Sequence, residues 1–131
     1  MTVELSNLRF SEEHEWVLKI EENQVRVGIS DYAQKQLGDI VFIEFPEVDT
    51  QVIANKTMGT IESVKAVSEL YSPVSGKVIS VNTELEDTPE MINENPYKLG
   101  WLVDIELSNI DELESLMTEE EYLAFTNEGD E

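Results

Sequence analysis

Residues 60–76 read TIESVKAVSELYSPVSG, with a single lysine between two short apolar runs. Two short runs of β-forming residues, 60–64 and 67–71, lie on either side of Lys65, so we predict a hairpin with this lysine near its tip. The residues next to the lysine are small or apolar and uncharged. A surface lysine at a turn is the ordinary interpretation. A protruding lysine on a rigid hairpin is also what a modifying enzyme needs to select one lysine among the six in the chain.

Strand patterns continue on both sides of this hairpin. Residues 15–21 (EWVLKIE), 24–30 (QVRVGIS) and 100–107 (GWLVDIEL) place apolar side chains at alternate positions, as half-buried strands do. Residues 39–45 (DIVFIEF) are apolar at successive positions until Glu44, which predicts a strand covered on both faces. All four prolines fall between these runs, where they remove no ladder hydrogen bond.

Helical patterns are few. Residues 30–38 (SDYAQKQLG) begin with a serine cap and end with a glycine, which predicts a helix of two turns. Near the end of the chain, two patterns that begin at Ser108 and Thr118 each resemble a capping box and predict terminal helices packed on the sheets. Residues 126–131 (TNEGDE) are expected to fray.

A weak internal repeat suggests how the strands are arranged. Residues 38–45 (GDIVFIEF) resemble residues 76–83 (GKVISVNT), and residues 58–64 (MGTIESV) resemble residues 99–105 (LGWLVDI). Two similar β halves can pack face to face. We therefore predict a mainly β fold, a flattened barrel or sandwich of two sheets with a short internal helix and C-terminal helices. The 131 residues suit one domain, with its core at about residues 8–125.

Charge and composition exclude several classes of function. A formal net charge of −21 repels phosphate backbones and anionic lipids, so we expect neither nucleic acid nor membrane as a partner. The charge serves either solubility or the docking of a small monomer onto positive patches of larger proteins. The chain has no cysteine, which excludes disulfides and thiolate chemistry. The N-terminal residues carry neither the pattern of a secretory signal nor the Arg-rich, acid-poor character of an organelle transit peptide, so the chain is either bacterial or already processed. We expect a bacterial cytoplasmic protein.

An enzyme is a poor fit to the residues available. The one histidine, His14, comes just before a predicted strand and lacks a nucleophile motif, so we interpret it as hydrogen-bonded near the strand start. Phosphate-binding and calcium-binding motifs are absent from the sequence. The three acids at Glu119–Glu121 follow a helix start, where carboxylates favour the helix dipole, and are interpreted as a solvated face rather than a metal site.

Four blocks of sequence, taken together, resemble the H proteins of the glycine cleavage system. They are HEW at 14–16, VGISDYAQKQLGDIVFIEFPEV at 27–48, ESVKAVSELYSPVSGKV at 62–78 and NENPYKLGW at 93–101. They occur in this order with sensible spacing, and the resemblance runs from about Leu8 to Phe125. One departure is Asp49, where the family usually has glycine; aspartate tolerates the left-handed conformation better than most residues.

The resemblance implies a lipoyl-domain-like fold in which Lys65 carries lipoate through an amide bond. It also implies three partner enzymes: a glycine dehydrogenase (decarboxylating), an aminomethyltransferase and a dihydrolipoamide dehydrogenase. The lipoyl arm carries the aminomethyl group of glycine from the first to the second, and the third reoxidises the arm. A lipoate ligase or octanoyltransferase, with a lipoyl synthase, would install the group.

Two other carriers would use the same lysine. Some relatives act as a platform from which lipoyl groups are relayed to 2-oxoacid dehydrogenase complexes, and the sequence does not separate the two roles. A biotin carrier is less compatible, because biotinyl domains usually have methionines beside the lysine, whereas Val64 and Ala66 stand here.

Two acids are candidates for further roles. Glu62, three residues before the lysine, is expected beside the hairpin tip, where the modifying enzyme would read it; a solvated strand carboxylate is the alternative. Glu15 is the candidate to hold the cationic amine of the loaded arm, because it begins the first strand next to the anchoring residue Trp16. Glu13 and Asp31 are alternatives for that role, and Glu15 as one more solvated acid is another.

Overall fold

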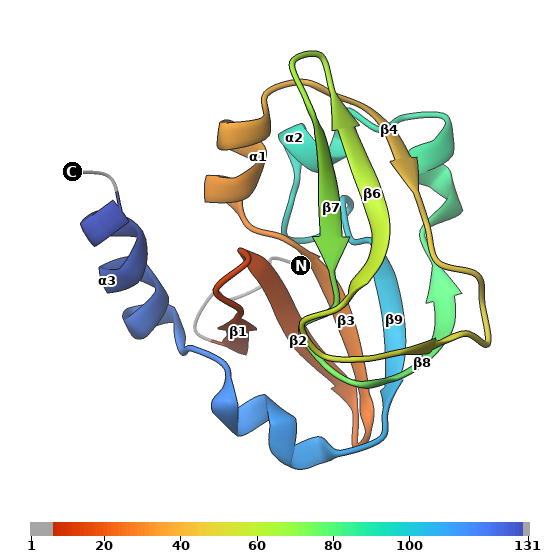
Figure 1. Cartoon of the computed structure of the whole chain (residues 1–131), viewed down its shortest axis with the longest axis vertical. Coiled ribbons are helices and arrows are strands. Elements are labelled where there is room, and N and C mark those ends of the chain that lie inside the picture. The colour runs from red at the N-terminus through yellow and green to blue at the C-terminus, as the bar shows by residue number, and fades with distance from the viewer. Residues whose placement is uncertain (1–6, 130–131) are drawn as a thin grey trace.

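The structure is a computed structural model that describes residues 7–129 of the chain. Within this range, nine strands form two antiparallel sheets, and short helical segments lie at their ends (Figure 1). The strands are β1 (Leu8–Phe10), β2 (Glu15–Glu21), β3 (Gln24–Ile29), β4 (Ile40–Glu44), β5 (Gln51–Val52), β6 (Thr57–Ser63), β7 (Val67–Tyr71), β8 (Gly76–Val81) and β9 (Val103–Leu107). The helical segments are α1 (Asp31–Leu37), η2 (Thr83–Glu86), α2 (Met91–Glu94), η3 (Ile110–Ser115) and α3 (Glu119–Gly129).

The larger sheet has the strand order β1-β2-β3-β9-β8-β5, and the smaller sheet has the order β4-β6-β7. The segments that resemble one another in sequence form equivalent antiparallel pairs: β4 pairs with β6 in the smaller sheet, and β8 pairs with β9 in the larger one. The predicted mainly β fold of two sheets with short helices is therefore confirmed.

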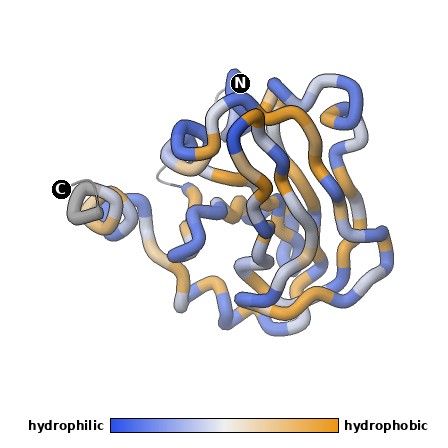
Figure 2. The backbone as a smooth tube through the Cα atoms, turned by 45° about the horizontal axis from the view of Figure 1, so that its top comes forward, coloured by the Kyte–Doolittle hydropathy of each residue, from blue (hydrophilic) through white to orange (hydrophobic). Residues whose placement is uncertain are grey.

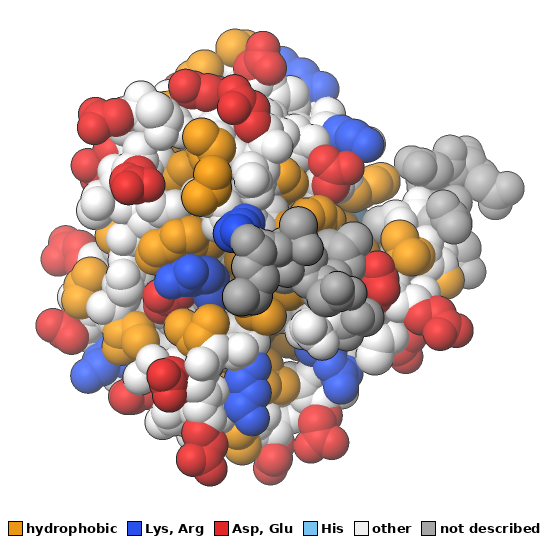
Figure 3. Space-filling view, turned by 180° about the vertical axis from the view of Figure 1, so that it is seen from behind, with side chains coloured by type: hydrophobic (Ala, Val, Ile, Leu, Met, Phe, Trp, Pro, Cys, Tyr) orange, Lys and Arg blue, Asp and Glu red, His pale blue; other side chains and the backbone are white. Residues whose placement is uncertain are grey.

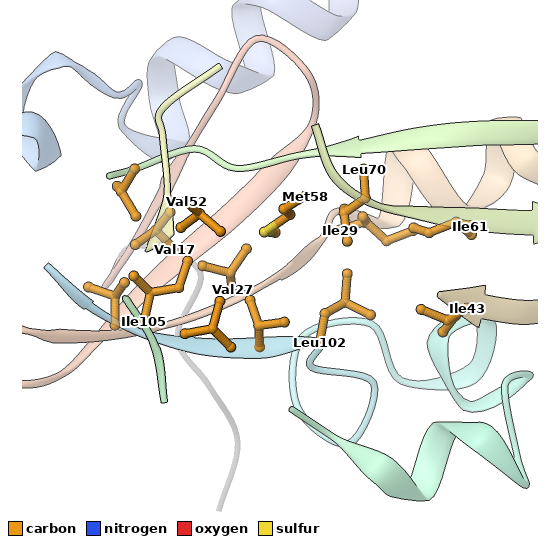
Figure 4. Packing of buried hydrophobic residues seen from close by; sticks show 14 of the residues in the cluster. Val17, Val27, Ile29, Ile43, Val52, Met58, Ile61, Leu70, Leu102 and Ile105 are labelled. Atoms are coloured by element: carbon orange, nitrogen blue, oxygen red, sulfur yellow. The ribbon is translucent and has the colours of Figure 1, made fainter. Parts of the chain in front are cut away.

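The main core lies between the two sheets. Ile29 of β3 lies beside Leu70 and Ile61 of the smaller sheet, and Val27 and Ile105 continue the same core along the larger sheet (Figure 4). Hydrophobic stretches run along the strands, and hydrophilic stretches lie at the peripheral turns (Figure 2). Burial of apolar area is the main favourable contribution to folding, so the alternation along β3 and β9 fixes which faces of the two sheets meet.

The prediction that the strand at residues 39–45 is covered on both faces was wrong. In β4, Ile40 and Ile43 are buried, whereas Val41 and Phe42 are about half exposed. The reason is that the outward face of the smaller sheet is exposed on all three of its strands, and the register of β4 shifts between Ile40 and Phe42.

A second, smaller cluster anchors the ends of the chain on the outside of the larger sheet. The ring of Tyr122 from α3 stacks on Phe10 at a centroid distance of 4.3 Å. Trp16 is fully buried, and its indole N–H donates to the carbonyl of Pro96 at 2.9 Å. The C-terminal helix is therefore held near the start of β2, although most of it lies beside the sheets (Figure 1).

The helix signals were mostly correct. The hydroxyl of Ser30 accepts from the backbone N–H of Ala33 and caps α1. The capping box at Thr118 is confirmed by hydrogen bonds exchanged with Glu121.

Other local predictions fared differently. The capping box predicted at Ser108 was wrong, because the side chain of Asn109 caps η3 instead. Asp49 adopts a φ of 77°, as the replacement of a glycine there required. Helix α3 continues to Gly129, and residues 130 and 131 of the segment predicted to fray lie outside the described part, so the fraying stays a prediction.

Acidic side chains are spread widely over the surface, mostly near the outline of the face shown in Figure 3. No helix within residues 7–129 is both long enough and apolar enough to cross a membrane.

Candidate functional site

Lys65 lies at the tip of the β6–β7 hairpin, as predicted, and this tip is the highest point of the molecule in Figure 1. The last paired residues of the hairpin are Glu62 and Val67, and the turn that connects the two strands contains Val64, Lys65 and Ala66. The lysine is exposed. Another protein can therefore reach this lysine from the hairpin end of the smaller sheet.

The turn is rigid because Ser63 organises it. The backbone N–H of Ser63 donates to the carbonyl of Ala66 at 2.8 Å, and the hydroxyl of Ser63 accepts from the backbone N–H groups of Lys65 and Ala66. The backbone N–H of Val64 donates to the carbonyl of Asp39 at 3.0 Å, which ties the tip to the loop between α1 and β4. The position of the lysine is thus fixed by backbone contacts from two segments.

The lysine side chain lies against the end of α1. A Cβ placed on Gly38 would be 3.6 Å from Cε of Lys65, and Gly38 has a φ of 78°, which favours glycine. The two ion pairs found among residues 7–129 do not include this lysine. Its amine is consequently not held by a carboxylate.

Glu62 lies on the outward face of the smaller sheet, beside the tip as predicted. It is exposed and stands directly between Phe42 of β4 and Val67 of β7 in the ladder. Its place therefore suits contact with any protein that approaches Lys65 from this face.

Glu15, the other candidate, is buried rather than solvated: its relative exposure is 2%. The hydroxyl of Ser11 donates to its Oε1 at 2.6 Å. Burial raises the pKa of this carboxyl to about 8, although hydrogen bonds from Ser11 and from the backbone of Tyr71 favour the charged form. The interpretation of Glu15 as one of many solvated acids does not hold.

Glu15 lies in the wall of a cavity of about 340 Å³ between the start of β2, helix α1 and the lysine hairpin, which we call the arm cavity. Apolar side chains from β3, α1, β6 and β7 cover much of its surface, and carboxyl, imidazole and phenol groups gather near β2. The lining residues are Glu13, His14, Glu15, Ile29, Tyr32, Ala33, Gln36, Leu37, Ile61, Ser68, Glu69, Leu70 and Tyr71.

The arm cavity is within reach of a chain attached to Lys65. Its wall on β7 begins at Ser68, three residues from the lysine, and a strand advances about 3.3 Å per residue. The near end of the cavity therefore lies about 10 Å along the strand from the tip. A linear side chain that is apolar along its length and cationic at its end matches the distribution of apolar and acidic groups in this cavity.

The surroundings of Glu13 and Asp31, the two alternatives to Glu15 as the acid that would hold the loaded arm, differ from those of Glu15. Glu13 also lines the arm cavity but is exposed. Asp31 lines a different cavity, and its carboxylate is engaged by Gln34 at 2.7 Å and by Lys35 at 3.0 Å. Glu15 is thus the buried acid that faces the arm cavity.

His14 is hydrogen-bonded near the start of its strand, as interpreted from the sequence, but its partner is distant in the chain. Its Nδ1 lies 2.7 Å from the hydroxyl of Tyr122, which is also 2.7 Å from Oγ of Ser30. Burial lowers the pKa of His14 below its ordinary value. The sequence carried no signal for this contact, because His14 and Tyr122 are 108 positions apart in the chain.

Within residues 7–129, no group of three or more histidine, cysteine or acidic side chains is placed to hold a metal ion. The acids Glu119–Glu121 lie in the first turn of α3, as the sequence indicated. The features that stand out are therefore the exposed lysine and the cavity beside it.

Comparisons with known proteins point to one family. The model of the glycine cleavage H-protein family matches residues 8–129. The glycine cleavage system H protein of Bacillus cytotoxicus is 57% identical over 123 residues, which cover 94% of this chain and 96% of the relative. That of Geobacillus thermodenitrificans is 52% identical over 122 residues, covering 93% and 95%. The crystal structure of the H protein from Mycobacterium marinum superimposes with a TM-score of 0.84 at 35% identity, covering 93% of this chain and 98% of that one.

Proposed function

Because this chain belongs to the glycine cleavage H-protein family, we propose that Lys65 is the residue through which it carries its lipoyl group. It is an H protein of the glycine cleavage system, a lipoyl carrier that is not itself catalytic. The observation that carries the assignment to Lys65 is its exposed position at a hairpin tip that Ser63 and Asp39 hold rigid. None of these contacts would be lost when another protein encloses the lysine.

The residues present fit such a group. Lysine supplies an unbranched stem, and a lipoyl chain in amide linkage extends the arm to roughly a dozen bonds, or on the order of 14 Å. This length covers the distance from the tip to the near end of the arm cavity. Amide formation removes the charge of the lysine. When attached, the lipoyl group supplies the disulfide and dithiol chemistry that this cysteine-free chain lacks.

We propose the partners in the same terms. The arm of Lys65 would accept the aminomethyl group of glycine at a glycine dehydrogenase (decarboxylating) and deliver it to an aminomethyltransferase, and a dihydrolipoamide dehydrogenase would reoxidise the dithiol. A projecting tip lets three different active sites receive the same arm. The bacterial sources of the relatives support a location in the bacterial cytoplasm.

The arm cavity gives Glu15 its proposed role. An amine bound to sulfur through one carbon is labile to water, so a carrier that travels between enzymes benefits from enclosing it. The carboxyl of Glu15, placed by Ser11, would ionise and hold the cationic amine by a charge-assisted hydrogen bond. The apolar side chains of Ile29, Ile61 and Leu70 would cover the hydrocarbon part of the arm.

The experiment that tests the assignment is peptide mapping by mass spectrometry. The protein is produced in a bacterial host supplied with lipoate, and its digest is searched for lipoylated lysine. We expect modification at Lys65 alone and none in the variant Lys65→Arg. Modification at Lys56 or Lys77 instead, or a fully lipoylated Lys65→Arg protein, would overturn the assignment.

A further inference from the structure

Apolar side chains are exposed around the lysine on the outward face of the smaller sheet. Phe42 of β4 is 55% exposed, Val67 of β7 is 67% exposed, and Val64 of the turn is 68% exposed. Phe42 and Val67 are the direct ladder neighbours of Glu62, so the three side chains form one row across the sheet. We call Phe42, Glu62, Val64 and Val67 the tip surface.

The tip surface contributes little to the core. On the inward side of the same strands, Ile43 and Ile61 are buried and fill the space between the sheets. A phenylalanine and two valines left to solvent beside a modified residue, in a chain that is otherwise strongly acidic, are typical of a protein contact. Because the turn and its two strands are rigid, this surface is presented without a cost for ordering it.

Acidic groups border the apolar row. The next row of the sheet, away from the tip, pairs Glu44 with Thr60 and Thr60 with Glu69, so carboxylates stand on both edge strands. Together with Glu62, they make a surface that is apolar near the lysine and negative behind it. A complementary partner has an apolar depression with basic side chains at its rim.

The reach of the lysine decides which partner this is. An unmodified lysine extends about 6 Å from its Cα, counting five bonds of about 1.2 Å each. An enzyme that acylates the amine must therefore bring its active site against the turn and contact the residues next to it. The enzymes that use the finished arm receive a chain on the order of 14 Å long, so they reach their substrate without covering the tip surface.

Resting on the proposed role of Lys65, we propose that the tip surface is the docking site for the enzyme that attaches the lipoyl group. Phe42 and Val67 are its apolar anchors, and Glu62 pairs with a cationic side chain of that enzyme. A lipoate ligase joins the carboxyl of lipoate to Nζ of Lys65 as an amide, with the cleavage of ATP to AMP and pyrophosphate driving the step. The docking site places the amine for this reaction and takes no part in the chemistry.

The test measures initial rates of lipoylation with a purified lipoate ligase, lipoate and ATP, at varied concentrations of the apo carrier. The variants are Phe42→Thr, Val67→Thr and the double variant, since threonine suits an exposed strand. The matched control is Ile53→Thr, because Ile53 is 60% exposed outside the tip surface. We expect kcat/KM to fall at least tenfold in the double variant, mainly through KM, and to change less than twofold in the control.

A second measurement separates this inference from the proposed function. The variants are brought to full lipoylation with excess ligase and assayed for glycine–CO2 exchange, where we expect rates within twofold of wild type. An equal loss of exchange activity would assign the surface to the decarboxylase and overturn the inference, as would an unchanged kcat/KM for lipoylation. If the wild-type protein is not lipoylated at Lys65, the proposed function fails instead. Melting temperatures close to that of wild type confirm that each variant is folded.

Discussion

The hydroxyl of Ser11 donates to the carboxyl of Glu15 at 2.6 Å and accepts from the backbone N–H of the same residue at 3.1 Å. The backbone closes this turn as well, because the N–H of Ser11 donates to the carbonyl of Glu15 at 2.9 Å. The carboxyl group is therefore held by its own turn and is not free to swing into solvent. Its direction toward the arm cavity is a property of the fold before any arm is attached.

The first prediction concerns how long the loaded carrier survives. A carboxylate that holds the cationic amine keeps it away from water, so Glu15→Gln should release ammonia several-fold faster than wild type. The measurement uses purified aminomethylated carrier without partner enzymes. Glu13→Gln is the control, because Glu13 lines the same cavity but is exposed. Equal rates in all three proteins would show that Glu15 does not shelter the arm.

The second prediction concerns the pH dependence of stability. Burial raises the pKa of Glu15 from an ordinary value near 4.5 to about 8, so the folded state keeps its proton in a range where the unfolded state has lost it. The free energy of unfolding should therefore fall as pH rises from about 4.5 to 8, by at most about 1.4 kcal/mol per pH unit. Above that range both states are ionised, and the slope should vanish.

The matched measurement is urea unfolding of wild type and of Glu15→Gln at a series of pH values. The variant keeps the other groups that face this carboxyl, namely Glu13, His14 and Tyr71, and lacks only the titration. The stability of wild type relative to the variant should decline from pH 5 to pH 8 and then level off. A difference that stays constant with pH would mean that Glu15 titrates normally.

Much of the fold could be predicted because its signals are local. Alternation along β3 and β9 identified the core faces, and Ser30 and Gly38 identified the ends of α1. The prediction that both faces of β4 are covered was wrong for a physical reason. A run of apolar residues has the same sequence pattern whether a second layer of the same chain or a partner protein covers it. The apolar character of Phe42 does not distinguish these two cases, whereas the structure does, because the outward face of the smaller sheet is exposed.

The site was predictable to a lesser degree. Lys65 could be found because the turn and its flanking strands are contiguous in the chain. The arm cavity could not, because its walls come from β2, α1 and β7, which meet only after folding. The hydrogen bond between His14 and Tyr122 is hidden for the same reason. The periodicity of apolar residues predicts helices and strands, but it does not predict which distant segments come into contact.

The third prediction concerns the attachment of α3. Tyr122→Phe keeps the ring stacked on Phe10 but removes the hydroxyl that lies 2.7 Å from both His14 Nδ1 and Ser30 Oγ. Because Ser30 is fully buried, we expect the free energy of unfolding to fall by about 1–3 kcal/mol. Urea unfolding measures it. Tyr71→Phe is the control, since its hydroxyl bonds Glu69 at the exposed surface; a loss as large there would argue against a special role for Tyr122.

The last prediction concerns encounter with the partner enzymes. A formal net charge of −21 creates a field that attracts positive docking surfaces and speeds association. Salt shortens the range of this field, to about 10 Å at 0.1 M ionic strength. At limiting carrier concentration, encounter controls the rate of glycine–CO2 exchange. This rate should therefore fall steadily as ionic strength rises from about 0.01 to about 0.3 M, which shortens the Debye length from about 30 Å.

The control is the oxidation of free dihydrolipoamide by dihydrolipoamide dehydrogenase. No charged carrier takes part in that reaction, so its rate should respond weakly to salt. If the exchange rate is as insensitive to salt as this control, the acidic surface serves solubility and does not guide docking.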